Sequence, residues 1–301
     1  MAEQSGDRLY HLLEQPALSD PVLVVVLDGW IDAGYAAAAA MSQLLQATET
    51  SPVAAFDVDL LVDHRARRPV IHLVEGVNTG LTWPSIELRR GQDLDQHDVL
   101  VLTGTEPDAR WRAFTSQVVD LAQSLGVRLV VGMGAYPAPV PHTRPVRLAT
   151  TATDAELAAR AGHVQTTVDV PGGVGAAIEE RCAAVGIPAV GLWAQVPHYA
   201  AGMAYPEASA SLLDGLCRLA DLRLDLESLH ETARIHRQRL DDLVSANLEH
   251  TQMVHNLETA YDAEQPALDG ADFTAGPGAG EELASEVERF LRDLEARGDD
   301  S

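Results

Sequence analysis

The sequence predicts an α/β protein with a mostly parallel sheet and helices on both faces. An unbroken apolar run at residues 22–27 ends in Asp28 and a glycine-containing loop, and an Ala-rich, helix-like stretch follows. The same order of strand, glycine loop and helix recurs at residues 98–125 and again further along the chain. With 301 residues and 46% hydrophobic content, the chain is long and apolar enough to bury a full core.

The first half of the chain supplies four predicted strands beyond the opening one. Residues 52–58 read as a strand, and a short polar connection covers residues 60–68. Residues 69–74 and 85–89 are expected to form an antiparallel pair at the sheet edge, joined by a turn-rich link at residues 75–84. The buried strand 98–102 then leads through the loop 103–108 into a helix at residues 110–125, which ends at Gly126.

The second half repeats this pattern around two unusual loops. The strand 127–131 is followed by a proline-rich loop at residues 132–145, and a structureless loop of that length usually has a function. The glycine loop 171–175 opens a helix at residues 176–184. The remaining predicted elements are strands at 147–151, 164–170 and 189–196 and helices at 154–160 and 206–219.

The C-terminal part is predicted to be a helical extension of the core domain, residues 1–222. Residues 223–262 carry apolar residues at alternating spacings of four and three, which predicts one long heptad-patterned helix. This helix either packs on its own subunit or forms a coiled coil with copies of itself. Residues 263–280 have the composition of a flexible linker, and residues 281–301 are expected to form a short, acidic, amphipathic helix.

Charge excludes several classes of function. The net charge is −24, and 19 acidic against 6 basic residues from Asp225 onward account for −13 of it, so a nucleic-acid partner is not expected. Every basic residue is arginine, which removes mechanisms that need a lysine ammonium. No apolar run approaches the roughly 20 residues that span a membrane, and no signal peptide is recognisable, so we expect no membrane partner and a cytoplasmic protein.

The candidate site lies where the predicted strands end, because ligands of open α/β sheets bind beyond the carboxyl ends of the strands. Each candidate has a structural alternative. The carboxylates could act as acids and bases or cap helices, the glycine loop could hold an anion or form a tight turn, and His142 could reach a ligand or brace its loop. The ligand-crevice candidates are Asp28, Trp30, Asp32, Glu106, Asp108, His142, Gly172, Gly173 and His198.

Metal and cofactor motifs are not found in this sequence. His230 and Glu231 begin like H-E-x-x-H, but position 234 is arginine, so the second ligand is missing and no metal site is predicted. Gly29 and Gly34 do not form the dinucleotide fingerprint, and no cofactor is predicted. No catalytic triad spacing is recognisable, and the catalytic residues, if any exist, are unknown.

Five segments together resemble a known family. They are LDGWIDAGYAAAAAM (27–41), LTGTEPDARW (102–111), GAYPAPVPHTRPV (134–146), PGGVG (171–175) and VPHYAAGMAYPEASASLLDGL (196–216). They resemble the second type of the proteasome assembly chaperone family, in its uncharacterised actinobacterial-like branch. The resemblance spans about residues 10–225 and implies a sandwich like that of purine nucleoside phosphorylases, often assembled as homotrimers.

The resemblance also implies a partner, a proteasome component, and it provides no established catalytic residue. Some family members dock through a C-terminal hydrophobic-Tyr-any tail, whereas this sequence ends in EARGDDS. The ATP-grasp ligase label that the family has carried is disfavoured, because ligases of that kind hold ATP phosphates with lysines. The leading hypothesis is a non-catalytic, homo-oligomeric, assembly-chaperone-like protein. The alternatives are a small-molecule or nucleoside-binding enzyme that uses the crevice, and a fold retained as a scaffold.

Overall fold

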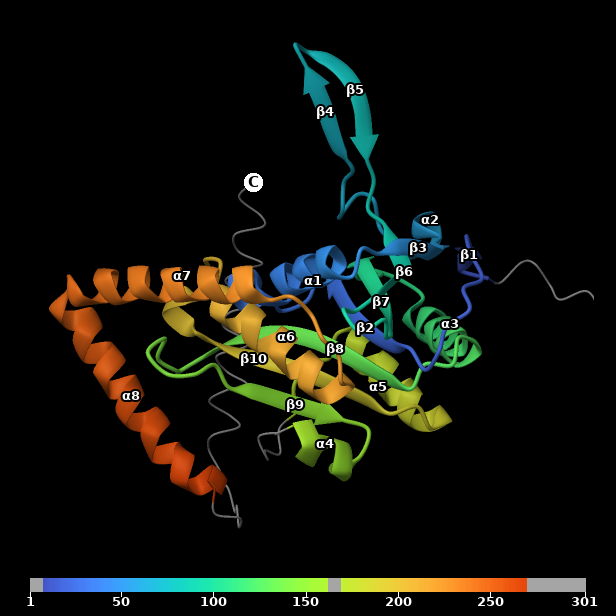
Figure 1. The fold of residues 1–301 in the computed structure, drawn as a ribbon. Helices are drawn as coiled ribbons and strands as arrows, with labels where there is room; N and C mark the ends of the chain where they lie inside the picture. Colours follow the sequence, from blue (N-terminus) through green and yellow to red (C-terminus); the bar gives the residue numbers. More distant parts are fainter. Residues whose placement is uncertain (1–7, 162–168, 270–301) are drawn as a thin grey trace, which may run out of the picture.

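The computed structural model describes residues 8–161 and 169–269, and it contains an eight-stranded sheet (Figure 1). The strand order is β1-β3-β6-β7-β2-β8-β10-β9. The bounds are β1 Tyr10–Leu12, β2 Val22–Asp28, β3 Ser51–Phe56, β6 Ile86–Gln92, β7 Asp98–Thr105, β8 Leu129–Ala138, β9 Leu148–Ala152 and β10 Ala189–Pro197.

The centre of this sheet is parallel. Strands β7, β2, β8 and β10 pair in parallel, and β3 runs in the same direction as they do. Strands β1, β6 and β9 run the opposite way. The predicted fold class, a mostly parallel sheet with helices on both faces and a helical extension, is confirmed, and the carboxyl ends of β2, β7, β8 and β10 meet at one edge.

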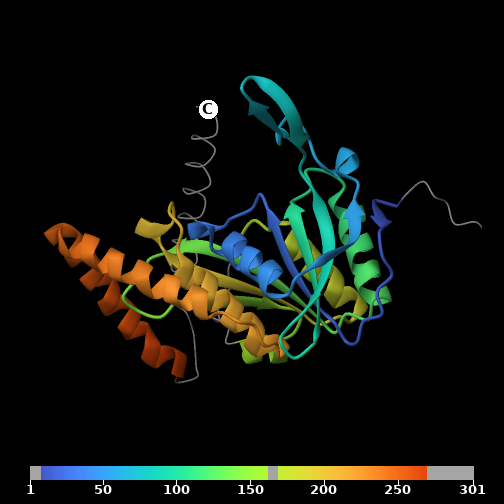
Figure 2. The same ribbon diagram turned by 45° about the horizontal axis from the view of Figure 1, so that its top comes forward.

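Helices cover the two faces because the buried strands present apolar side chains to both sides. On β2, Val22, Val24 and Val26 belong to one core cluster with residues of α1, α4 and α6, whereas Leu23 and Val25 belong to a second cluster with residues of α3 and α5. Figure 2 shows helices on both sides of the sheet. The bounds are α1 Ala36–Ala47, α2 Val58–Leu61, α3 Trp111–Ser124, α4 Ala155–Ala161, α5 Val174–Val185 and α6 Pro206–Ala220, with 3-10 turns at Ala33–Tyr35 and His198–Ala200.

The predicted edge pair of residues 69–74 and 85–89 is wrong. Strand β4 (Val70–Val74) pairs instead with β5 (Val77–Thr82), which lies in the segment predicted to be a turn-rich link. Glu75 and Gly76 both have positive φ, as a two-residue hairpin turn requires, and this turn brings β5 back onto β4. Strand β6 takes the place in the main sheet between β3 and β7.

The predicted single long helix is also wrong. Helix α7 (Glu227–Ser245) and helix α8 (Leu248–Asp269) are separate, because Asn247 Oδ1 accepts hydrogen bonds from the backbone N–H groups of Glu249 and His250 and starts a new helix. The heptad residues Leu226 and Leu240 belong to the core of this same chain. Residues 263–269, predicted as linker, continue α8, and the rest of the predicted linker and the helix 281–301 lie outside the described residues.

Two loop expectations change as well. The loop 132–145 is shorter than predicted, because β8 continues to Ala138 alongside β10. Most of the predicted strand 164–170 lies outside the described residues. Within the described part of the chain, no helix is both long and apolar enough to cross a bilayer.

Candidate functional site

The ends of β2 and β7 bring the predicted acidic loops together. The backbone N–H of Glu106, just after β7, donates to the carbonyl oxygen of Asp28 at 2.7 Å. Burial raises the pKa of Asp28 and Glu106. The sequence grouped these loops because parallel strands of the same sheet end at the same edge, and the contact shows that they are neighbours.

Glu106 caps helix α5. Its Oε1 accepts a hydrogen bond of 2.6 Å from the backbone N–H of Val174, and its side chain is buried. A Cβ at Gly173 would lie 3.0 Å from Trp30 Cγ and 3.1 Å from Glu106 Oε1, so glycine lets the three groups pack closely. Burial raises the pKa of Glu106, and the Val174 N–H group opposes that rise. Gly172 is exposed one residue earlier.

Asp32 caps helix α1. Its two carboxylate oxygens accept hydrogen bonds from the backbone N–H groups of Ala37 and Ala38 at 2.7 and 3.0 Å. Desolvation is the main cause of a raised Asp32 pKa, and the nearby Asp28 carboxylate adds to it. Asp32 also forms an isolated bridge to Ala135 of β8, which places it beside the third parallel strand.

Arg67 is the cation of this acidic group, and the sequence did not single it out. Its Nε donates to Asp108 Oδ1 at 3.1 Å, and its guanidinium lies where a Cβ at Gly29 would approach within 2.7 Å. Its charge opposes the rise in pKa of both Asp28 and Glu106. A signal was present in the sequence, because the basic run at residues 64–68 precedes the apolar hairpin in a chain whose strand-end loops are rich in carboxylates.

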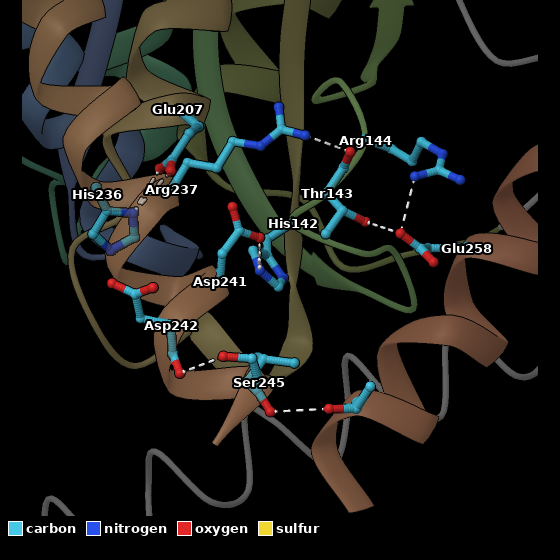
Figure 3. Close-up of polar contacts among 12 residues, drawn as sticks. His142, Thr143, Arg144, Glu207, His236, Arg237, Asp241, Asp242, Ser245 and Glu258 are labelled. Carbon is cyan, nitrogen blue, oxygen red and sulfur yellow. Dashed lines mark hydrogen bonds and ion pairs between the residues drawn. The ribbon is translucent and has the colours of Figure 1, made fainter. Parts of the chain in front are cut away.

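His142 belongs to a second group of residues. The Tyr199 hydroxyl accepts from the backbone N–H of His142 at 2.8 Å and lies 2.7 Å from its Nδ1, so that hydroxyl donates to Nδ1. His142 Nε2 therefore carries the proton and donates to Asp241 Oδ1 of α7 at 3.1 Å (Figure 3). The ring is 1% exposed, and burial lowers its pKa although Asp241 opposes that change.

The residues around His142 attach helices α7 and α8 to the loop after β8. We call the contacts of residues 142–147 with these helices the clamp (Figure 3). Thr143 donates to Glu258 at 2.6 Å, and Arg144 pairs with Glu258 and Asp262. Further clamp contacts are Arg237 Nη2 donating to the Thr143 carbonyl, Tyr261 hydroxyl donating to the Pro145 carbonyl, and the Arg147 guanidinium 3.5 Å from the centre of the Tyr261 ring.

The structure thus divides the predicted crevice residues into two groups. Asp28, Trp30, Asp32, Glu106, Asp108 and the two glycines surround the ends of β2 and β7 with Arg67. His142 lies in the clamp, and His198 is exposed with its ring edge-on to Tyr199. Among the described residues, no three His, Cys, Asp or Glu side chains are grouped as a metal site requires.

Comparison with known proteins identifies the family. A Mycobacterium tuberculosis protein of unknown function has 34% identity and a TM-score of 0.83, covering 96% of this chain and 98% of its own. A Corynebacterium glutamicum protein of unknown function has 32% identity and a TM-score of 0.81, covering 86% and 98%. A Mycobacterium tuberculosis proteasome-assembly chaperone homologue has 32% identity and a TM-score of 0.72, covering 77% and 99%.

None of the proteins with curated descriptions matches this chain. The sequence pattern of the PAC2 family, in contrast, matches residues 26–244, which include the end of β2, every other strand of the main sheet except β1, and the contact of His142 with Asp241 in the clamp. The match confirms the resemblance found in the five motifs of the sequence. The chain belongs to the PAC2 family.

Proposed function

We propose that this chain is a non-catalytic, homo-oligomeric, cytoplasmic protein that binds other proteins and assists their assembly, with the homotrimer as its favoured state. One observation carries the proposal: several of the candidate polar side chains at the carboxyl ends of the strands have structural partners. Asp32 and Glu106 cap helices, and both ring nitrogens of His142 are occupied. A general base needs a free position within hydrogen-bond reach of a substrate.

The family supports a proteasome component as the client. The related protein from Mycobacterium tuberculosis is a proteasome-assembly chaperone homologue, and it aligns over 99% of its length. A strongly acidic chaperone also suits a client that must be released, since charge accelerates encounters more than it strengthens the final complex.

The test is capture of unassembled proteasome subunits by the full-length chain. Purified α- and β-subunits from the organism that encodes the chain are mixed with it, and complexes and assembled particles are followed by size exclusion and native gels. We expect a complex with unassembled subunits and faster particle formation. An unrelated acidic protein of equal charge controls for electrostatic adhesion. The proposal fails if neither complex nor acceleration is seen.

One observation favours a second candidate, a small-molecule binder or enzyme acting at the crevice. The pKa values of Asp28, Asp32 and Glu106 are all raised by desolvation, and perturbed carboxylates gather at active sites. This candidate predicts a thermal shift with a nucleoside, nucleotide, phosphate or amino acid, because a ligand that binds the native state stabilises it. Glu106→Gln would abolish that shift while leaving subunit capture intact.

A further inference from the structure

A two-stranded hairpin projects from the α/β body. Strands β4 and β5, joined at Glu75 and Gly76, form a separate sheet that stands away from the main one (Figures 1 and 2). We call residues 70–82 the arm. Its side-chain hydrogen bonds, from Thr79 to the His72 carbonyl and between His72 and Thr82, stay within the arm.

The arm is apolar on both faces. The register sets Ile71 opposite Leu81 and Val74 opposite Val77, so that side chains alternate between the faces. The large apolar side chains are 46% to 64% exposed. One face carries Ile71, Leu73 and Leu81, and the other carries Val70, Val74 and Val77. A lone two-stranded ribbon is marginal in water, and a concentrated apolar surface of this kind marks an interaction site.

Charge indicates which partner covers the arm. The whole chain carries −24, yet Glu75 is the only acidic residue among residues 70–82, and no arginine or lysine accompanies it. Two copies of a strongly acidic chain repel over most of their surface, but two arms can meet at little electrostatic cost. At the base of the arm the exposed Arg65 and Arg68 lie close in sequence to the exposed Asp63, so this base is not strongly acidic either.

Another pair of strongly exposed apolar residues fits a second copy less well. Leu243 and Leu248, at the turn between α7 and α8, are 66% and 85% exposed. They stand beside Asp241, Asp242 and Glu249, so contact between two copies there would bring like charges together. The arm also has edges for pairing, since each of its strands is bonded along one side only in the described sheet.

We propose that the arm docks against the arm of a second copy of this chain, burying the apolar faces of both hairpins. The inference rests on the homo-oligomer of the proposed function and names the surface that forms it. In the favoured homotrimer the arms would meet about the threefold axis, with one apolar face of each arm against the other face of the next arm.

The first experiment is light scattering of the full-length chain and two matched variants. Leu73→Glu with Val77→Glu puts one charge on each face of the arm, and the two residues are not directly opposite. Leu243→Glu with Leu248→Glu makes the same change at the turn between α7 and α8. We expect a multimer for the wild type and the control, and the mass of one chain for the arm variant. Circular dichroism shows that each variant is folded.

The outcomes separate the two proposals. A wild type that is a single chain overturns both the homo-oligomer and the arm contact. A multimeric wild type whose arm variant keeps its mass overturns the arm contact alone. An arm variant that stays multimeric but loses capture of proteasome subunits assigns the arm to the client, which also overturns the inference.

A second experiment directly tests the contact between the arms of two copies. Leu81→Cys is made with Cys217→Ser, and a short bismaleimide reagent is added to the multimer; Cys182 is buried. We expect a covalently linked pair of chains. A multimer that gives no linked pair shows that the arm rests on another part of its neighbour and overturns the proposed contact.

Discussion

The arm and the helices α7 and α8 both extend from the α/β body, and they are held in opposite ways. The clamp joins α7 and α8 to the body through buried polar and aromatic contacts, such as those of His142 and Tyr261. The arm keeps its apolar side chains exposed on both faces. The difference teaches that the side chains of an added segment can be covered by contacts within its own chain or left exposed for another chain to cover.

The largest expected effect would loosen the clamp. Tyr261 is 4% exposed, and its ring lies under the Arg147 guanidinium. Tyr261→Ala removes this buried aromatic ring, so we expect the free energy needed to detach α8 from the body to fall by about 3–5 kcal/mol. Hydrogen exchange of α8 measures the loss. Tyr261→Phe, which removes only the hydrogen bond to Pro145, should cost about 1 kcal/mol. If hydrogen exchange in α8 is as slow in Tyr261→Ala as in the wild type, the clamp does not hold α8 and the contrast with the arm is wrong.

The next largest effect is expected in the loops at the carboxyl ends of the strands, and it tests whether these loops stabilise the fold as the clamp does. Glu106→Ala leaves the start of α5 without its cap and should lower the free energy of unfolding by about 1–2 kcal/mol. Glu106→Gln keeps an acceptor and removes a desolvated charge, so we expect stability at pH 7 to be equal or higher. Denaturant unfolding distinguishes them. A glutamine variant as unstable as the alanine variant would mean that the charge itself is needed.

A smaller change is expected from pH. Burial lowers the pKa of His142, so below the ordinary value of 6.5 the unfolded chain takes up a proton before the folded one. Stability is therefore fully present above that value and falls as pH drops through it. Asp32 and Glu106 have raised pKa values, so protonation of the folded carboxyls acts in the opposite direction at lower pH.

The measurement is the free energy of unfolding between pH 8 and pH 5, a range that brackets the ordinary pKa of 6.5. His142→Asn should flatten the fall that the wild type shows. A variant with the wild-type slope would show that the clamp histidine is not responsible.

The smallest effect is expected in the arm. Val77→Thr keeps the β-branched shape at an exposed position, so the unfolding free energy of the dissociated chain should change by less than about 0.5 kcal/mol. The matched control, Val101→Thr in β7, buries a hydroxyl at a fully covered position and should cost about 1–3 kcal/mol. A comparable loss in both variants would mean that the arm is stabilised within its own chain.

The sequence by itself determined the core of this protein. The apolar runs of β2, β7, β8 and β10 and the helices between them were predictable because burial on both faces leaves a local hydrophobic signal. The acidic loops could be grouped from that pattern alone, since parallel strands share an edge.

Only the tertiary structure decided where the less regular segments go. A two-residue turn at Glu75 and Gly76, not hydrophobicity, selected β5 as the partner of β4, and the Asn247 side chain divided the heptad helix. His142 meets Asp241 across 99 positions of sequence, and Arg67 meets Asp108 across 41. Such contacts leave no periodic trace, because each depends on the folded path that brings two distant residues together.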